Sequence, residues 1–290
     1  MRPEIEEAIT LLRKGDESAV QRALEILQGT VLSFGIKVCG HREDAEDTAQ
    51  EVLFRALPHL AKLEDPRALS AWLYTAAKNR CWQGRRRATY RRTLSLDELI
   101  PDDAELHALL LTDPAPNPEG EALSRQDHQM LHKAVLALPP QYRMVLVLHD
   151  MEEMDTGLVG KILSLQPGTV RVRLHRARLL VRQEMGKLLQ GVAEPKKRQK
   201  TKKGRRPAQC REIFGNLSDY LDGEMAVQSC EQLRRHIEGC PACVAFIEDL
   251  KRAIERCRAL DVCPKEGPQP VLQGLLTKEY LRLKNFPSDL

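Results

Sequence analysis

Histidine and cysteine residues near position 240 have the spacing of a metal site. His236 and Cys240 are four residues apart, which is about one helical turn, and Cys243 follows after a proline and an alanine. Thiolate and imidazole are the ligands that Zn²⁺ prefers, and a structural zinc site takes four of them. We predict a zinc site whose fourth ligand is Cys210, with Cys230 as the alternative for that place. Copper or cadmium would also suit these soft ligands and could act as a signal.

A basic helix is predicted to begin near Pro167, because proline is tolerated in the first turn of a helix. At about 100° per residue, Arg171, His175 and Arg178 fall on one side of this helix, and an apolar stripe that includes Val170 falls about 100° away. The apolar stripe can pack while the basic side meets phosphates and bases. The alternative is an ordinary amphipathic helix whose arginines are solvated.

A short helix is predicted over residues 156–163, directly before the basic helix. Two helices joined by a short turn form a helix-turn-helix, whose second helix enters the major groove of DNA. Gly157 and Gly160 each cost about 1 kcal/mol relative to alanine, so we expect this first helix to be loose. The pair predicts a module that reads double-stranded DNA.

A second basic stripe lies upstream, where residues 78–92 hold seven Lys or Arg and no acid. Asn79 has poor helix propensity, and its amide suits a base edge, although it can instead bond to the backbone. Trp82 and Tyr90 stand among the arginines, where they can stack on unpaired bases or, alternatively, belong to a core. Two separate basic stripes favour two contacts with one polyanion.

Further helices are predicted over residues 4–14, 17–28, 40–57 and 66–84. In the third of these, Asp44, Asp47 and Glu51 share one face and small apolar residues share another. A solvated acidic face is the alternative to a docking surface there. Together these patterns predict an all-α fold, which agrees with an aromatic content of 4%.

Composition limits the classes of function. No stretch is apolar enough for a signal peptide or a membrane span, so we expect a cytoplasmic protein with no membrane contact. Six of the eight cysteines lie within residues 210–263, and in a reducing compartment this favours metal or redox chemistry over a disulfide framework. A phosphate-cradling glycine loop and a nucleophile with a paired base are both missing, so we predict that the chain is not an enzyme.

Two linkers divide the chain into modules. Residues 96–125 hold eight acids and four prolines without helical periodicity, and residues 191–208 include eight Lys or Arg. The predicted modules are therefore residues 1–95, 126–190 and 209–262. The tail, residues 263–290, has apolar residues at helical spacing and could form a helix that packs against the first two modules.

Four motifs in order carry a resemblance to a known family. GHREDAEDTAQEVLFRAL, AWLYTAAKNRC, ALPPQYRMVLVL and QPGTVRVRLHRAR resemble the two modules of bacterial extracytoplasmic-function (ECF) sigma factors of the sigma-70 family. The Cys/His pattern after residue 209 is similar to the zinc-binding domain of anti-sigma factors. The resemblance implies that residues 1–95 are sigma region 2 and residues 126–190 are sigma region 4, with an anti-sigma-like domain fused behind them.

The resemblance also implies roles for particular residues. Core RNA polymerase would dock on one side of the acidic helix, at Asp44, Asp47, Gln50, Glu51 and Phe54. The −10 promoter element would be contacted by Leu63, Lys78, Asn79, Arg80, Trp82, Arg85 and Arg86. The −35 element would be contacted by Thr169, Arg171, Val172, Arg173, His175, Arg176 and Arg178.

We therefore predict a sigma factor that binds core RNA polymerase and promoter DNA and starts transcription. Its carboxyl-terminal domain would contact the sigma modules of the same chain and modulate them in response to a metal or an oxidant. We expect a monomer when the chain is free. The alternatives are a stand-alone helix-turn-helix regulator and a metal-responsive interaction protein that does not bind polymerase.

Overall fold

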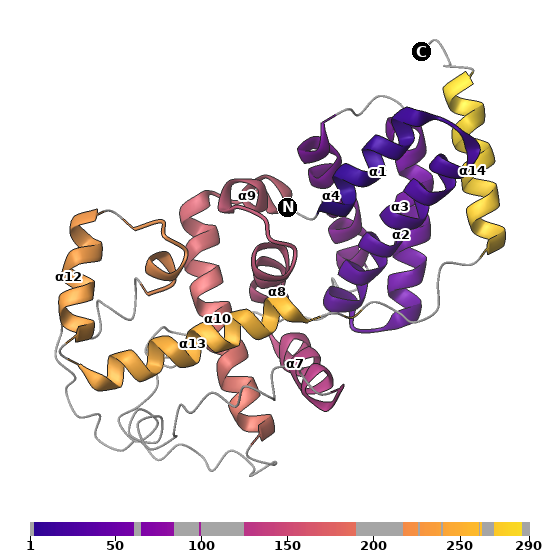
Figure 1. Cartoon of the computed structure of the whole chain (residues 1–290). Helices are drawn as coiled ribbons and strands as arrows, with labels where there is room; N and C mark the ends of the chain where they lie inside the picture. The colour runs from indigo at the N-terminus through magenta and orange to yellow at the C-terminus, as the bar shows by residue number, and fades with distance from the viewer. Residues whose placement is uncertain are drawn as a thin grey trace. The chain divides into compact units, whose positions relative to one another are not determined.

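A computed structural model describes residues 3–60, 65–83, 99, 125–189, 217–225, 227–238, 240–260, 262 and 270–285. Every regular element within these ranges is a helix, which confirms the predicted all-α class (Figure 1). The chain forms two compact units. The first combines residues 1–89, 147–167 and 261–290, and the second combines residues 90–146 and 168–260. None of the described helices has the length and apolarity that crossing a membrane requires.

Four amino-terminal helices form the bundle of the first unit. They are α1 (Pro3–Lys14), α2 (Glu17–Cys39), α3 (Arg42–Leu60) and α4 (Pro66–Gln83). The Asp16 carboxylate caps α2 by accepting a hydrogen bond from the Ala19 N–H at 2.8 Å. Gly40 ends the same helix in the left-handed conformation, with φ at 78°, which glycine adopts without strain.

The second helix differs from its prediction, because it runs eleven residues past the expected end at residue 28. Val31, Phe34 and Val38 in this extension are all buried. Gly35 allows the close approach of α3 here, since a Cβ at this position would lie 3.0 Å from the Ala45 Cβ. The extension is enclosed on several sides, so it lacks the amphipathic period on which the prediction relied.

A buried ion pair connects α2 to the segment that precedes α9 (Thr156–Leu163). The Lys37 ammonium lies 2.7 Å from Glu152, and both side chains are fully buried. The Tyr74 hydroxyl from α4 donates to the other oxygen of Glu152, also at 2.7 Å. Glu152 directly follows the π-helical turn η1 (Val147–Met151). The pair therefore fixes this later segment to the amino-terminal bundle.

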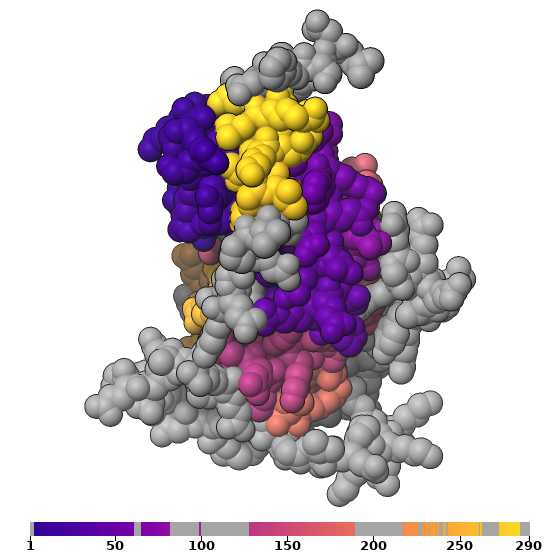
Figure 2. All heavy atoms as spheres, turned by 90° about the vertical axis from the view of Figure 1, so that its right-hand side faces the viewer, coloured from indigo at the N-terminus to yellow at the C-terminus, as the bar shows by residue number. Residues whose placement is uncertain are grey.

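The tail supplies one further helix of the first unit, α14 (Pro270–Asn285), which packs on the amino-terminal bundle. Figure 2 shows α14 in yellow against the indigo and purple helices of the bundle, and its contacts are with α2 and α3. Leu276 and Tyr280 are buried in this contact, and Gln273 donates a hydrogen bond to Gln28. The carboxyl-terminal helix thus completes the amino-terminal core.

The second unit contains the basic helix and most of the Cys/His region. Its elements are α7 (Arg125–Ala137), α8 (Pro140–Leu146), α10 (Pro167–Leu189), α12 (Val227–Glu238) and α13 (Pro241–Ala259). Helix α10 begins at Pro167, as predicted, and three residues separate it from α9. Helix α9 spans residues 156–163 despite its two glycines, and the Asp155 carboxylate caps it through the Leu158 N–H at 2.8 Å.

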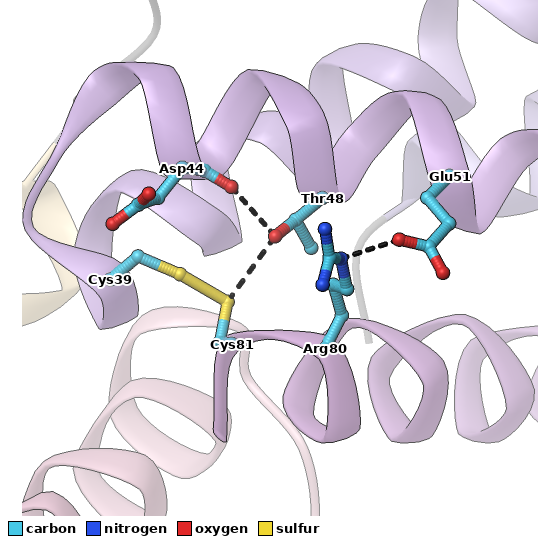
Figure 3. Close-up of a disulfide and its surroundings, with 6 residues drawn as sticks. All are labelled: Cys39, Asp44, Thr48, Glu51, Arg80 and Cys81. Carbon is cyan, nitrogen blue, oxygen red and sulfur yellow. Dashed lines mark hydrogen bonds and ion pairs between the residues drawn. A yellow bond between two sulfur atoms is a disulfide. The ribbon is translucent and has the colours of Figure 1, made fainter. Parts of the chain in front are cut away.

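The two cysteines outside the carboxyl-terminal cluster form a disulfide that sequence reasoning missed. Cys39 at the end of α2 and Cys81 in α4 are joined, with their Cα atoms 5.8 Å apart (Figure 3). The Thr48 hydroxyl of α3 lies 3.8 Å from the Cys81 sulfur. The cross-link therefore lies beside the helix that carries the predicted polymerase-docking residues.

Reduction of this disulfide is expected to lower the free energy of unfolding by about 2–4 kcal/mol, because it releases a long loop in the unfolded chain. The two cysteines are 42 residues apart in sequence. Urea denaturation with and without dithiothreitol measures the change. The double substitution Cys39→Ser and Cys81→Ser is the control, since it should remove the effect of the reductant. An unchanged unfolding midpoint on reduction of the wild type would contradict the cross-link.

Candidate nucleic-acid interface

The residues predicted to contact the −35 element divide into two sides of α10. Arg171, His175 and Arg178 lie on one side, which we call the engaged side because residues 217–224 contact it. The others lie on the adjoining side, which we call the open side. The open side consists of Thr169, Val172, Arg173 and Arg176.

The engaged side is held by a short acidic stretch, residues 217–224. The Arg178 guanidinium makes two hydrogen bonds to the Asp222 carboxylate, each of 2.8 Å, and its side chain is fully buried. Arg171 forms an ion pair with Glu224 at 2.7 Å. His175 Nδ1 lies 2.9 Å from the Ser218 hydroxyl. Both polar and charged groups of this side thus have partners in the carboxyl-terminal region.

Helix α13 contributes a further contact to the same line of α10. Arg182 forms an ion pair with Asp249, and its guanidinium carbon lies 4.8 Å from the centre of the Phe246 ring. An arginine over an aromatic face adds a cation–π attraction to the ion pair. The contact with α10 therefore involves both residues 217–224 and α13.

The acidic stretch holds a third carboxylate, Asp219, beside Asp222 and Glu224. Burial raises the pKa of Asp219, the nearby charges of Glu224 and Asp222 add to the rise, and the charges of Arg171 and Arg178 oppose it. Three carboxylates thus lie around two arginines. Such an arrangement resembles the way in which phosphate groups surround arginine in protein–DNA complexes.

The open side keeps its side chains accessible. Val172 is 53% exposed, and Thr169 is exposed as well. Arg173 and Arg176 are half-buried, and within the described part of the chain neither forms a salt bridge. Exposed polar groups and arginines in the first turns of such a helix can reach base edges and phosphates.

The residues predicted for the −10 element are partly engaged in contacts with α9. Lys78 Nζ donates a hydrogen bond of 2.7 Å to the Ile162 carbonyl, and burial lowers the pKa of this lysine. Arg80 forms an ion pair with Glu51 of α3. Asn79 is exposed and lines a cavity of about 850 Å³ bounded by residues of α3, α4 and α9. Leu63, Arg85, Arg86 and the side chain of Trp82 lie outside the described residues.

The predicted polymerase-docking side of α3 is accessible. Asp44 and Asp47 are exposed, and Gln50 and Glu51 are half-buried. Phe54 is 48% exposed, which is unusual for a large apolar side chain in the described structure. An exposed aromatic ring beside carboxylates is typical of a protein–protein contact.

Two of the four predicted metal ligands can be located. Cys240 precedes α13 and makes no side-chain capping bond, and Cys243 is buried in the first turn of that helix. Two thiols three residues apart at the positive end of a helix dipole suit a zinc–thiolate site. The backbone of His236 lies in the last turn of α12, while its side chain and all of Cys210 lie outside the described residues. Among the described residues no group of three metal-binding side chains is assembled.

Sequence reasoning missed the partners of the basic helix. Asp222 and Glu224 precede the predicted ligand His236 in the sequence, but no local pattern connects them to Arg178 or Arg171. The only available signal was that α10 is basic and residues 217–224 are acidic. Charge alone did not indicate which arginines would be paired.

Comparison with known proteins identifies three segments. Residues 24–91 match the family model described as "Sigma-70 region 2", and residues 128–181 match "Sigma-70, region 4". Residues 210–243 match the model described as "Putative zinc-finger". The limits of this last match coincide with the first and last predicted metal ligands, Cys210 and Cys243.

Similar whole proteins carry sigma-factor names. The chain is 27% identical to the ECF RNA polymerase sigma factor SigW of Bacillus subtilis (strain 168), over 62% of this chain and 96% of that protein. It is 30% identical to the ECF RNA polymerase sigma factor SigL of Mycobacterium tuberculosis (strain H37Rv), over 59% of this chain and 93% of that protein. It is 26% identical to the RNA polymerase sigma-H factor of Pseudomonas aeruginosa, over 63% of this chain and 95% of that protein.

Proposed function

We propose that this chain, which belongs to the ECF RNA polymerase sigma factors, binds core polymerase through α3, recognises promoter DNA through α4 and α10, and is modulated by its own carboxyl-terminal domain. The observation that carries the proposal is the open side of α10. Arg173 and Arg176 there are cations without a described ion pair, next to the exposed Val172. A helix that did not bind a polyanion would have little use for them. RNA synthesis itself would belong to the polymerase.

The accessible side of α3 supports docking to polymerase. Asp44 and Asp47 offer charges that suit a basic partner, and Phe54 offers an apolar anchor. Exposed Asn79 supports contact with the −10 element, because an amide can form two hydrogen bonds with an adenine edge.

Modulation by the carboxyl-terminal domain is supported by the contacts of α10 with Asp222, Glu224 and Asp249. We propose that Cys210, His236, Cys240 and Cys243 hold Zn²⁺ in this domain. The metal would supply a structural cross-link between α12 and α13 when bound. A softer metal or an oxidant acting on the thiolates would alter that cross-link.

Substitution in α3 tests the proposed function. We expect Asp47→Lys combined with Phe54→Ala to lower the affinity for core polymerase by about 30-fold, because an aromatic anchor alone contributes about 2 kcal/mol or more to such contacts. Fluorescence titration of labelled full-length chain with core polymerase measures the loss. Glu7→Lys, an exposed charge reversal on α1, is the matched control and should bind normally.

Transcription by the reconstituted holoenzyme gives the second readout. A library of random duplexes would yield the promoter, and the wild type should initiate from it while the α3 variant does not. A chain that binds duplex DNA but neither joins polymerase nor supports initiation would be the stand-alone regulator instead.

A further inference from the structure

We propose that residues 217–224 are a built-in competitor of DNA: their carboxylates occupy the positions that promoter phosphates would take on the engaged side of α10. This inference rests on the proposed function, in which α10 reads the −35 element. It adds the direction of the regulation, which is inhibition, and identifies the group that inhibits.

The contact between Arg178 and Asp222 has the geometry of phosphate binding. Two guanidinium nitrogens each donate to a different carboxylate oxygen at 2.8 Å. An arginine makes the same paired hydrogen bonds to two oxygens of a phosphate. The Arg178 side chain is fully buried and its two paired donors are occupied by Asp222, so these donors cannot bind DNA until Asp222 leaves.

Two other residues on the engaged side of α10 also contact the acidic stretch. Glu224 forms an ion pair with Arg171 at 2.7 Å, about two helical turns from Arg178, and the Ser218 hydroxyl contacts His175 between them. Arg171 keeps 42% of its side-chain surface exposed, so this end of the contact is more open to solvent. Displacement by DNA would therefore start at Arg171 and proceed to the buried Arg178.

Charge on the acidic stretch also acts on the open side. Asp219, Asp222 and Glu224 place up to three negative charges beside the helix that carries Arg173 and Arg176. A duplex approaching the open side would meet their repulsion within one Debye length, which is about 8 Å at physiological salt. The acidic stretch therefore blocks the engaged side by direct contact and weakens DNA binding to the open side by charge repulsion.

A covalent tether keeps this competitor in place without tight binding. The acidic stretch and α10 belong to one chain, and a covalent connection of this kind gives an effective concentration in the mM range. A promoter at nanomolar concentration competes poorly with such a segment. Polymerase binding or a change in the metal site could shift the balance, since α13 takes part in the same contact through Asp249.

Neutral substitutions test the proposal in the full-length chain. Asp222→Asn with Glu224→Gln keeps the size of both side chains and removes two charges. We expect this variant to bind the −35 duplex, recovered by the promoter selection, about ten times more tightly than the wild type. The dependence of log K on log[salt] should steepen by about 0.9 for each arginine returned to a phosphate.

The matched control is Glu248→Gln with Glu255→Gln, two exposed acids of α13 that give the same change in net charge. It should leave affinity and salt dependence close to those of the wild type. Equal gains in both double variants would assign the effect to net charge and overturn the proposal. So would an affinity of the Asp222/Glu224 variant equal to that of the wild type.

Hydrogen exchange in the wild type gives a readout that does not depend on any variant. The amides of Asp222, Gly223 and Glu224 donate to backbone carbonyls within the acidic stretch. Saturation with the −35 duplex should accelerate their exchange as the stretch leaves α10. Unchanged or slower exchange would show a permanent scaffold and would overturn the competition.

Failure of the proposed function has a different signature. Adding Arg173→Ala and Arg176→Ala to the unmasked variant should weaken −35 binding more than tenfold. If these substitutions have no effect, α10 is not the reader, and the proposed function fails together with the masking. If they do weaken binding while the acidic substitutions have no effect, α10 binds the −35 element as proposed, and only the competition by residues 217–224 is wrong.

Discussion

Lys37→Ala is expected to lower the free energy of unfolding by about 3–5 kcal/mol, because it removes one partner of a buried ion pair with Glu152. Both side chains are fully buried, and the Tyr74 hydroxyl would still donate a hydrogen bond to this carboxylate. Water would have to enter the site to solvate the Glu152 carboxylate, and this change loosens the segment that leads to α9. Urea denaturation followed by circular dichroism measures the loss.

The control for this prediction removes both charges together. In Lys37→Met with Glu152→Gln, the amide oxygen can still accept the hydrogen bond from Tyr74, and the methionine fills the space of the lysine stem. We expect this double variant to be much closer to the wild type than Lys37→Ala, since paired removal avoids an isolated buried charge. A loss below about 1 kcal/mol in Lys37→Ala would show that the carboxylate is solvated.

His236→Ala or Cys240→Ser is expected to lower bound zinc from about one ion per chain to near zero. A structural zinc site contributes about 10–16 kcal/mol of apparent binding free energy, and it requires four protein ligands, which the variants no longer supply. Metal analysis of the purified, dialysed chain measures the stoichiometry. The same substitutions should alter promoter output, because Cys240 and Cys243 begin the helix whose Asp249 contacts Arg182.

Two further substitutions identify the fourth ligand. Cys210→Ser should lose zinc as His236→Ala does, whereas Cys230→Ser should retain it. The reverse result would give the fourth place to Cys230. Full zinc content in His236→Ala would refute the whole site.

The elements that could be predicted are those with a local signal. Pro167 and the apolar stripe on the following helix predicted where α10 begins and which side of it packs, and both Val170 and Leu174 are buried. The tail helix followed from its spacing, although Leu275 in that pattern proved to be 56% exposed. Local propensity and periodicity suffice for such helices.

Long-range pairing could not be predicted, because it has no period in the sequence. Nothing in the local sequence marks Lys37 as buried, and its partner Glu152 lies 115 residues away. The same holds for Cys39 and Cys81, and for Arg178 with Asp222. Sequence reasoning selected Arg178 as a DNA contact from its type and position, and it could not detect that a second module engages the same guanidinium.

Helix α14 has a consequence for the order in which the protein matures. A ribosome makes α2 and α3 well before α14, the helix that packs on them and whose Leu276 and Tyr280 are buried. The bundle that carries the polymerase-docking helix therefore acquires its last core layer after the acidic stretch and the Cys/His region have been synthesised. A message cut short upstream of residue 270 would yield a bundle with exposed apolar surface, a target for proteases, rather than an unrestrained initiator of transcription.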